Sequence, residues 1–215
     1  RRIAKLHIMF EECGLQKGDK VAICGRNQAN WAVSFLSAMT YGAVPVPLLH
    51  EFKSSNIHYL VNHSEAKILF VDDVIWEGLS ETEMPDLHAI IQVNTFKLLY
   101  SAREQITEAR AHINELFGKK HPMAFTSDDL HYYEDSADEL AVINYTSGTS
   151  GFSKGVMIPY RAILSNLQFG RQVLPGLDNT KNVVSMLPSA HMYGLMFELL
   201  YELSVGAHVH FLSRV

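Results

Sequence analysis

The chain has 215 residues, of which 47% are hydrophobic and 19% are charged. This composition is typical of a globular protein and excludes a disordered chain or a fibre. The formal net charge of −5 leaves no basic excess, so nucleic acid is not an expected partner. The two cysteines, Cys13 and Cys24, exclude a disulfide framework and fit a reducing compartment, so we expect a cytoplasmic protein.

The chain ends and one uncharged stretch bear on completeness and on membranes. The sequence begins with Arg1 and stops at Val215, directly after a strand-like run, so we expect it to be part of a longer protein. Residues 27–49 carry no charge and are long enough to span a bilayer, but Gly42 and two prolines interrupt them. A helix followed by a short strand fits better. We therefore expect no transmembrane segment, while peripheral membrane contact stays open.

Helical and strand patterns alternate along the first ninety residues. Residues 3–13 predict a helix with Gly14 as its C-cap, and Asn27 is the expected N-cap of a helix that ends near Gly42. Strands are predicted at 21–24, 43–49, 67–71 and 89–93, and a further helix at 54–62. Strands separated by helices form βαβ units, so the sequence predicts an α/β fold with mainly parallel sheets and flanking helices.

The next fifty residues are less regular. Apolar residues from Leu99 to Leu116 recur every three or four positions, which predicts one amphipathic helix closed by Gly118. We interpret its stripe as core-facing, because it covers fewer than three heptads of a coiled coil. Residues 127–139 are rich in Asp and Glu. We interpret them as a solvated linker, although paired carboxylates can also bind a hard cation.

A segment rich in glycine and hydroxyl side chains follows a predicted strand at 140–144. It reads Thr146, Ser147, Gly148, Thr149, Ser150, Gly151, Phe152, Ser153, Lys154, Gly155. Glycines let backbone N–H groups approach a phosphate, hydroxyls add donors, and lysine adds a compact charge. A Walker loop is excluded, because Ser153 precedes Lys154 and Gly155 follows it. A second strand at 156–158 predicts that the loop joins two strands.

The charge distribution around this loop favours an anion. Residues 141–177 contain no Asp or Glu but include Lys154, Arg161 and Arg171, which gives +3 within a chain of −5. A polyanion meets little repulsion in such a segment. On composition alone, a plain Gly/Ser surface loop stays open as the alternative.

Residues 145–156 resemble the phosphate-binding signature of the adenylate-forming (AMP-binding) enzymes, which include the long-chain acyl-CoA synthetases. The family pattern is Tyr-Thr-Ser-Gly-Thr-Thr-Gly-x-Pro-Lys-Gly-Val, in which Ser150 here replaces a Thr and Ser153 replaces the Pro. Residues 18–23, 42–48, 64–70 and 187–194 resemble further family segments, in the family's order, whereas residues 95–134 match none. The resemblance implies that residues 1–215 are the N-terminal portion of an AMP-binding domain, without the C-terminal lid domain.

The resemblance also implies a reaction and a set of site residues. A carboxylate attacks the α-phosphate of ATP, pyrophosphate leaves, and coenzyme A then takes the acyl group. By resemblance, the β- and γ-phosphates, bridged by Mg²⁺, are bound by Thr146, Ser147, Gly148, Thr149, Ser150, Gly151 and Lys154. His191 lines the acyl carboxylate pocket, which Tyr193 and Gly194 shape, and Lys154 and His191 are the expected catalytic residues. Without the family pattern, His191 in its apolar run is a candidate core residue.

The implied partners are small molecules: ATP, a carboxylic acid and coenzyme A. The apolar residues after His191 favour a long-chain fatty acid; they are Met192, Leu195, Met196, Phe197 and Leu199. The alternatives are an aryl or amino acid adenylation domain, or a non-catalytic nucleotide-binding module. The family's Tyr-Gly-x-Thr-Glu stretch, which supplies adenine and metal contacts, is not present in these residues. We therefore assign no metal ligand and expect residues 1–215 to be inactive alone.

Overall fold

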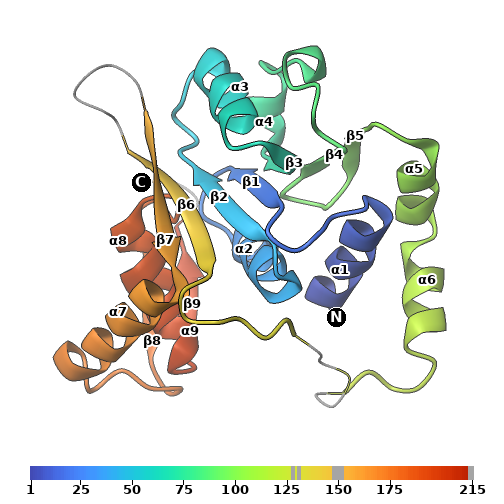
Figure 1. Ribbon diagram of the computed structural model, residues 1–215. Helices are drawn as coiled ribbons and strands as arrows, with labels where there is room; N and C mark the ends of the chain where they lie inside the picture. The colour runs from blue at the N-terminus through green and yellow to red at the C-terminus, as the bar shows by residue number, and fades with distance from the viewer. Residues whose placement is uncertain (127–128, 130–131, 147–152, 213–215) are drawn as a thin grey trace.

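The computed structural model describes residues 1–126, 129, 132–146 and 153–212. Its first part is a five-stranded sheet in the order β2-β1-β3-β4-β5 (Figure 1). The strands are β1 Lys20–Cys24, β2 Val44–Leu48, β3 Ala66–Val71, β4 Ala89–Gln92 and β5 Leu98–Ser101. All neighbouring pairs are parallel except β4 with β5. The predicted α/β class with mainly parallel strands is therefore confirmed.

Helices cover both faces of this sheet. They are α1 Arg2–Glu12, α2 Ala29–Tyr41, α3 Ser54–His63, α4 Asp73–Trp76, the 3₁₀ helix η1 Glu81–Glu83, α5 Glu104–Ala111 and α6 Ile113–Lys120. Successive strand residues point to opposite faces. In β3, Phe70 packs in the core with α1 and α2, whereas Leu69 packs with α3 on the other face. Burial on both faces is why these strands are mostly apolar along their whole length.

The second part of the chain forms a hairpin and a small helical layer (Figure 1). Strands β6 Leu140–Thr146 and β7 Lys154–Pro159 pair antiparallel, and β6 lies against β2. Helix α7 Tyr160–Val173 follows. Strands β8 Asn182–Ser185 and β9 His208–Phe211 then pair in parallel around α8 Met192–Leu195, the π-helix η3 Met196–Leu200 and α9 Tyr201–Ser204. In the part of the chain that the structure describes, no helix is long and apolar enough to cross a membrane.

The single helix expected over 99–116 is wrong. Its first residues belong to strand β5, which pairs with β4, and the helix then begins at Glu104 and breaks at His112. The second piece runs through Gly118 to Lys120. The apolar spacing nevertheless reflects burial, because Ile106 and Ala109 are core residues. Sheet hydrogen bonds to β4 overrode a local pattern that is compatible with a helix.

Two predicted helix caps are displaced by one residue. Cys13 is the C-cap of α1, and Gly14 follows it with φ +70°, in the left-handed region that glycine favours. Gln28, rather than Asn27, is the N-cap of α2. Cys13 and Cys24 are free and buried, and burial raises the pKa of both thiols to about 12, so they stay protonated at neutral pH.

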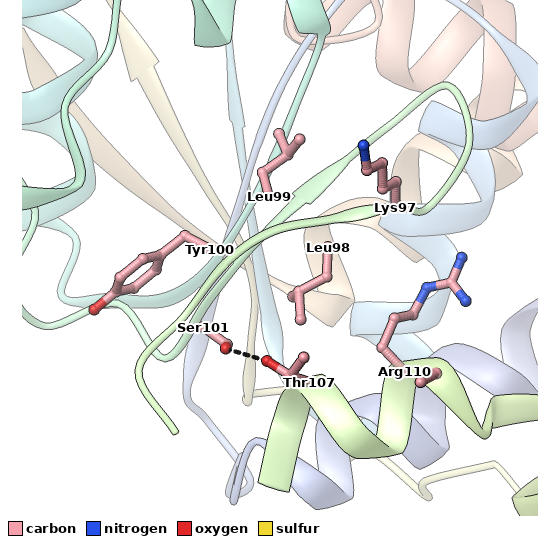
Figure 2. Close-up of a pocket in the computed structure, with 8 residues that line it drawn as sticks. Lys97, Leu98, Leu99, Tyr100, Ser101, Thr107 and Arg110 are labelled. Atoms are coloured by element: carbon pink, nitrogen blue, oxygen red, sulfur yellow. Dashed lines mark hydrogen bonds between the residues drawn. The ribbon is translucent and has the colours of Figure 1, made fainter. Parts of the chain in front are cut away.

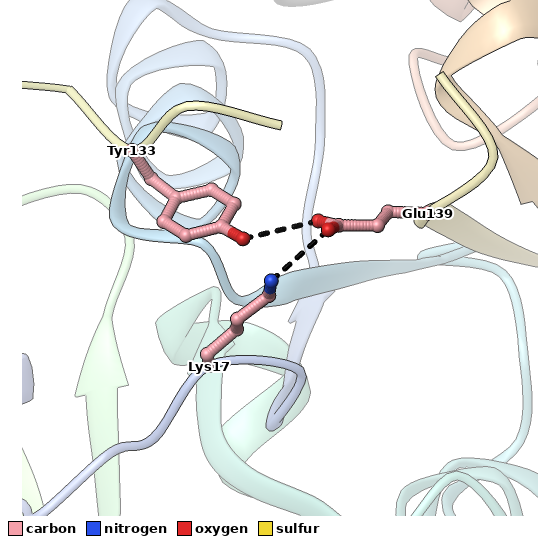
Figure 3. Close-up of polar contacts among 3 residues, drawn as sticks. All are labelled: Lys17, Tyr133 and Glu139. Atoms are coloured by element: carbon pink, nitrogen blue, oxygen red, sulfur yellow. Dashed lines mark hydrogen bonds and ion pairs between the residues drawn. The ribbon is translucent and has the colours of Figure 1, made fainter. Parts of the chain in front are cut away.

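The acidic linker is held to the first part of the chain by its own charges. Residues 132–139 contain no helix or strand. Lys17 Nζ lies 3.0 Å from Glu139 Oε1, and the Tyr133 hydroxyl donates to Glu139 Oε2 at 3.2 Å (Figure 3). The Tyr133 ring also packs against Gly42, where a Cβ would lie 2.8 Å from it. Residues 133–139 of the linker are therefore docked through Tyr133 and Glu139, and Asp138 pairs with Arg161.

Candidate functional site

The β6–β7 hairpin places the two ends of the glycine- and hydroxyl-rich loop opposite each other. In its register Tyr145 faces Gly155, and Thr146 faces Lys154. The loop therefore joins two strands, as expected. Thr146 and Lys154 are both exposed at its base. The predicted residues Ser147, Gly148, Thr149, Ser150 and Gly151 lie outside the described residues, so their part in the site stays a prediction.

Tyr145 anchors the base of the loop to the first part of the chain. Its hydroxyl lies 2.7 Å from His63 Nδ1, on α3, and the side chain is buried. Burial raises the pKa of the phenol to about 12, so it remains neutral. Gly155 makes room for its ring, because a Cβ there would lie 3.2 Å from Tyr145 Cε1. Strand β6 is thus packed as far as Tyr145, whereas Thr146 and Lys154 at the two ends of the loop are exposed.

The predicted acyl-site residues lie at the start of helix α8. His191 is its N-cap: its Nδ1 accepts a hydrogen bond from the Tyr193 N–H at 3.3 Å. In the neutral ring this leaves Nε2 as the N–H donor. His191 is exposed, so the alternative reading as a core histidine is wrong. Tyr193 is also exposed, whereas Gly194 is buried against the preceding segment, where a Cβ would lie 2.5 Å from the Pro188 carbonyl oxygen.

Asn144 connects the phosphate-loop hairpin to the His191 turn. Its Nδ2 donates to the Ala190 carbonyl oxygen at 2.9 Å, and the side chain is only 4% exposed. Asn144 lies two residues before Thr146, and Ala190 lies one residue before His191. The two predicted parts of the site are therefore tied together through one buried hydrogen bond.

Two further polar side chains hold the segment that precedes His191, which we call the 185–190 segment. Asn27 Nδ2 donates to the Leu187 carbonyl at 2.6 Å and to Ser185 Oγ at 3.2 Å, and its Oδ1 accepts the Ser189 N–H at 2.7 Å. Glu198 Oε2, on η3, accepts the N–H groups of Met186 and Leu187 at 2.7 and 2.8 Å. These contacts satisfy backbone groups of residues 186–190, which follow β8 and belong to no helix or strand.

Sequence reasoning did not find the roles of Asn27 and Glu198. Asn27 was expected to cap α2, and its actual partners lie about 160 residues away in the sequence. Glu198 is the single acidic residue in the otherwise uncharged stretch 187–201, and Asn144 is a polar residue in an apolar strand. A lone polar residue in an apolar run is a signal that could have pointed to the structural roles of Glu198 and Asn144.

The charge of the 141–177 region is partly neutralised by the fold. Arg161 pairs with Asp138, which lies just outside that region. Lys154 forms no ion pair or side-chain hydrogen bond within the described residues. Lys154 is therefore the better placed of the two for an anion at the hairpin. Among those same residues, no group of three or more His, Cys, Asp or Glu side chains could hold a metal ion.

A cavity of about 430 Å³ lies at the carboxyl ends of the parallel strands. Arg26, Asn27, Asp72 and Asn94 contribute to its wall, and they follow β1, β3 and β4. Asp72 Oδ2 accepts the Arg26 N–H at 2.7 Å, while burial raises the pKa of the Asp72 carboxyl. Open parallel sheets bind ligands at this edge. Asn27 lines this cavity and also hydrogen-bonds to the 185–190 segment, so the cavity and the segment are adjacent.

Comparison with known proteins places these features in a family. Residues 1–215 match the AMP-binding enzyme family, and the chain belongs to it. Long-chain-fatty-acid–CoA ligase 1 of Homo sapiens is 27% identical over 228 residues, which cover 98% of this chain and 32% of the relative. The chain thus spans about a third of the length of the curated relatives it matches.

Solved structures confirm the fold. ATP-bound MatB from Rhodopseudomonas palustris has a TM-score of 0.77 at 22% identity, covering 100% of this chain and 39% of MatB. O-succinylbenzoate coenzyme A synthetase (MenE) from Bacillus subtilis, in complex with AMP, has a TM-score of 0.72 at 18% identity, covering 100% of this chain and 48% of MenE. At these identities the likeness concerns the fold. The human relative is named for a long-chain fatty acid and MenE for O-succinylbenzoate, so these names do not agree on one acid.

Proposed function

We propose that this chain carries the triphosphate-binding and acyl-binding parts of an AMP-forming acid–thiol ligase. The observation that supports this most is the connection between the two predicted site elements. Thr146 and Lys154 face each other at the base of the loop, and Asn144 ties that hairpin to the residue before His191. A nucleotide phosphate and a carboxylate bound at these two elements would be held by one continuous framework.

The proposed chemistry needs charge stabilisation at the hairpin. When a carboxylate attacks the α-phosphate of ATP, the P–O bond to the β-phosphate breaks and pyrophosphate leaves with the electron pair. Lys154 and the hydroxyl and backbone donors of residues 146–151 would stabilise the charge that develops on it. The Nε2–H of His191 would donate to the acyl carboxylate and orient it. Mg²⁺ is not assigned to any residue, because the described residues contain no group of three or more His, Cys, Asp or Glu side chains that could hold it.

The proposed acid is a long-chain fatty acid, and coenzyme A is the proposed thiol. Support for the acid comes from the human relative's name. The apolar residues after His191 support it less than expected, because Leu195, Met196 and Leu199 are buried in the core and only Met192 and Phe197 are partly exposed. An aryl acid is the second candidate, favoured by the likeness to MenE. An amino acid stays a further alternative.

Pyrophosphate exchange by the full-length protein tests the proposal. We expect exchange into ATP with palmitate and little with benzoate or amino acids. Lys154→Ala should lower the exchange rate about a hundredfold, the usual effect of removing one donor to a developing anion. Lys181→Ala, which removes an exposed lysine before β8, is the matched control and should change nothing. Exchange with benzoate alone would replace the fatty acid with an aryl acid. ATP binding without exchange for any acid would mean a non-catalytic module.

A further inference from the structure

A cavity of about 240 Å³ lies at the sheet edge opposite the hairpin. It is enclosed by α1, the turn between β4 and β5, α5 and α6. The hairpin contacts β2, at one edge of the five-stranded sheet, whereas β5 forms the other edge (Figure 1). The cavity therefore does not belong to the candidate site. Half of the described residues that line it come from α1 and β4, and the other half lie between positions 95 and 114.

The cavity combines an apolar floor with a cationic rim. Leu6, Met9 and Ile113 are core residues that contribute to its lining. The three charged residues that line it are Arg2, Lys5 and Arg110, and its described lining contains no Asp or Glu. Cations gathered around one opening without a carboxylate attract an anion, and an apolar floor favours an attached hydrocarbon group.

The cations are held in place by neutral partners. Arg2 Nη1 donates to Asn30 Oδ1 at 3.0 Å, Lys5 Nζ donates to Asn114 Oδ1 at 2.6 Å, and Arg110 Nε donates to the Phe96 carbonyl at 2.6 Å. None of them forms an ion pair within the described residues. Each charge is thus oriented but not neutralised, as a preformed anion site requires.

Arg110 is the central residue of this basic surface. It is half-buried, and only its Nε is used by the Phe96 carbonyl, so both terminal guanidinium nitrogens remain free for a ligand within the part of the chain that is described. Phe96 has φ +56°, a conformation that non-glycine residues rarely adopt. Figure 2 shows an adjoining cavity that is also lined by Arg110, on α5, and by Lys97, which directly precedes β5. These two residues extend the same basic surface.

We propose that this cavity binds an amphipathic anion, with a phosphate or carboxylate head at Arg110 and Lys5 and a short hydrocarbon group against Leu6, Met9 and Ile113. The head can belong to a free molecule or to a lipid at a membrane surface. Both sources share this chemistry. The site is independent of the proposed ligase activity, because none of these residues lies in the hairpin or the His191 turn.

Calorimetric titration of the full-length protein with octyl phosphate tests the free source, in the presence of saturating ATP. We expect saturable binding at one site, weakened at least tenfold by Lys5→Met and by Arg110→Met. Both substitutions keep an unbranched chain and remove the charge. Lys119→Met, at an exposed position of α6 outside the cavity, is the matched control and should bind as the unmodified protein does. Octanol, which lacks the charge, should bind at least tenfold more weakly than octyl phosphate.

Vesicle sedimentation tests the membrane source with the same variants. The membrane source predicts binding to phosphatidylglycerol vesicles but not to phosphatidylcholine vesicles, and loss of that binding in Lys5→Met and Arg110→Met. This result would assign the anion to a lipid head even if octyl phosphate does not bind. Equal binding of octanol and octyl phosphate would overturn the proposal, since the cavity would then be merely apolar. So would unchanged binding of both octyl phosphate and vesicles in the two variants. Thermal unfolding of each variant verifies that it is folded.

Discussion

Replacing Asn27 by Ala should loosen the 185–190 segment and the His191 turn that follows it. The substitution removes three hydrogen bonds, of which the one from the Ser189 N–H matters most, because Ser189 is only 1% exposed. A buried donor left without a partner costs about 1–3 kcal/mol. Leu187 is 41% exposed, so water can replace Asn27 at its carbonyl oxygen at little cost.

The expected local loss is therefore about 2 kcal/mol, which corresponds to roughly a 30-fold change in an opening equilibrium. Amide hydrogen exchange of the full-length protein, followed by mass spectrometry, measures this directly. Exchange of residues 185–191 should accelerate roughly 30-fold in Asn27→Ala. Asn27→Asp retains the oxygen that accepts the Ser189 N–H, so it should accelerate exchange less.

Asn30→Ala is the matched control for this prediction. Asn30 is the next asparagine in the chain, and its Nδ2 donates to the Asn94 carbonyl at 2.7 Å instead of to the 185–190 segment. It should leave the exchange of residues 185–191 unchanged. If Asn27→Ala accelerates that exchange no more than Asn30→Ala does, the segment is held by other contacts and the reasoning fails.

Three further predictions concern glycines, a buried acid and activity. Gly194→Ala should lower the midpoint of thermal unfolding, because its Cβ would lie 2.5 Å from the Pro188 carbonyl, whereas Gly118→Ala, with nothing within 4 Å, should raise it slightly. Burial raises the pKa of Glu202, so the folded state holds its proton more tightly than the unfolded state. Stability is then lost as pH rises from the ordinary glutamate pKa through the raised one. Glu202→Gln should therefore raise the unfolding midpoint at pH 7.5 but not at pH 4, and equal midpoints of variant and parent at pH 7.5 would contradict this. Residues 1–215 alone should form no acyl-adenylate from ATP and palmitate in a radiolabel assay; detectable product would refute that expectation.

Elements whose pattern is local were predictable from the sequence. The strands at 67–71 and 89–93 are mostly apolar, apart from Lys67 and Gln92. They pair in parallel, because such apolar strands are buried on both faces. The glycine- and hydroxyl-rich loop was placed between two strands, and β6 and β7 flank it as an antiparallel pair. The residues from 99 to 116 show the limit of this reasoning, since helical spacing in the sequence did not prevent β5 from forming.

The sequence by itself determined the fold class, the position of the loop and the chemistry of its residues, because these follow from the period of apolar residues and from side-chain type. Only the tertiary structure decided which distant segments meet. Asn27 contacts the 185–190 segment, and Asn144 contacts Ala190, across separations of up to 162 residues. Helix α1 likewise packs against α5 and α6, about a hundred residues further along the chain. Such contacts depend on how the packed elements are placed, and a short stretch of sequence carries no record of that placement.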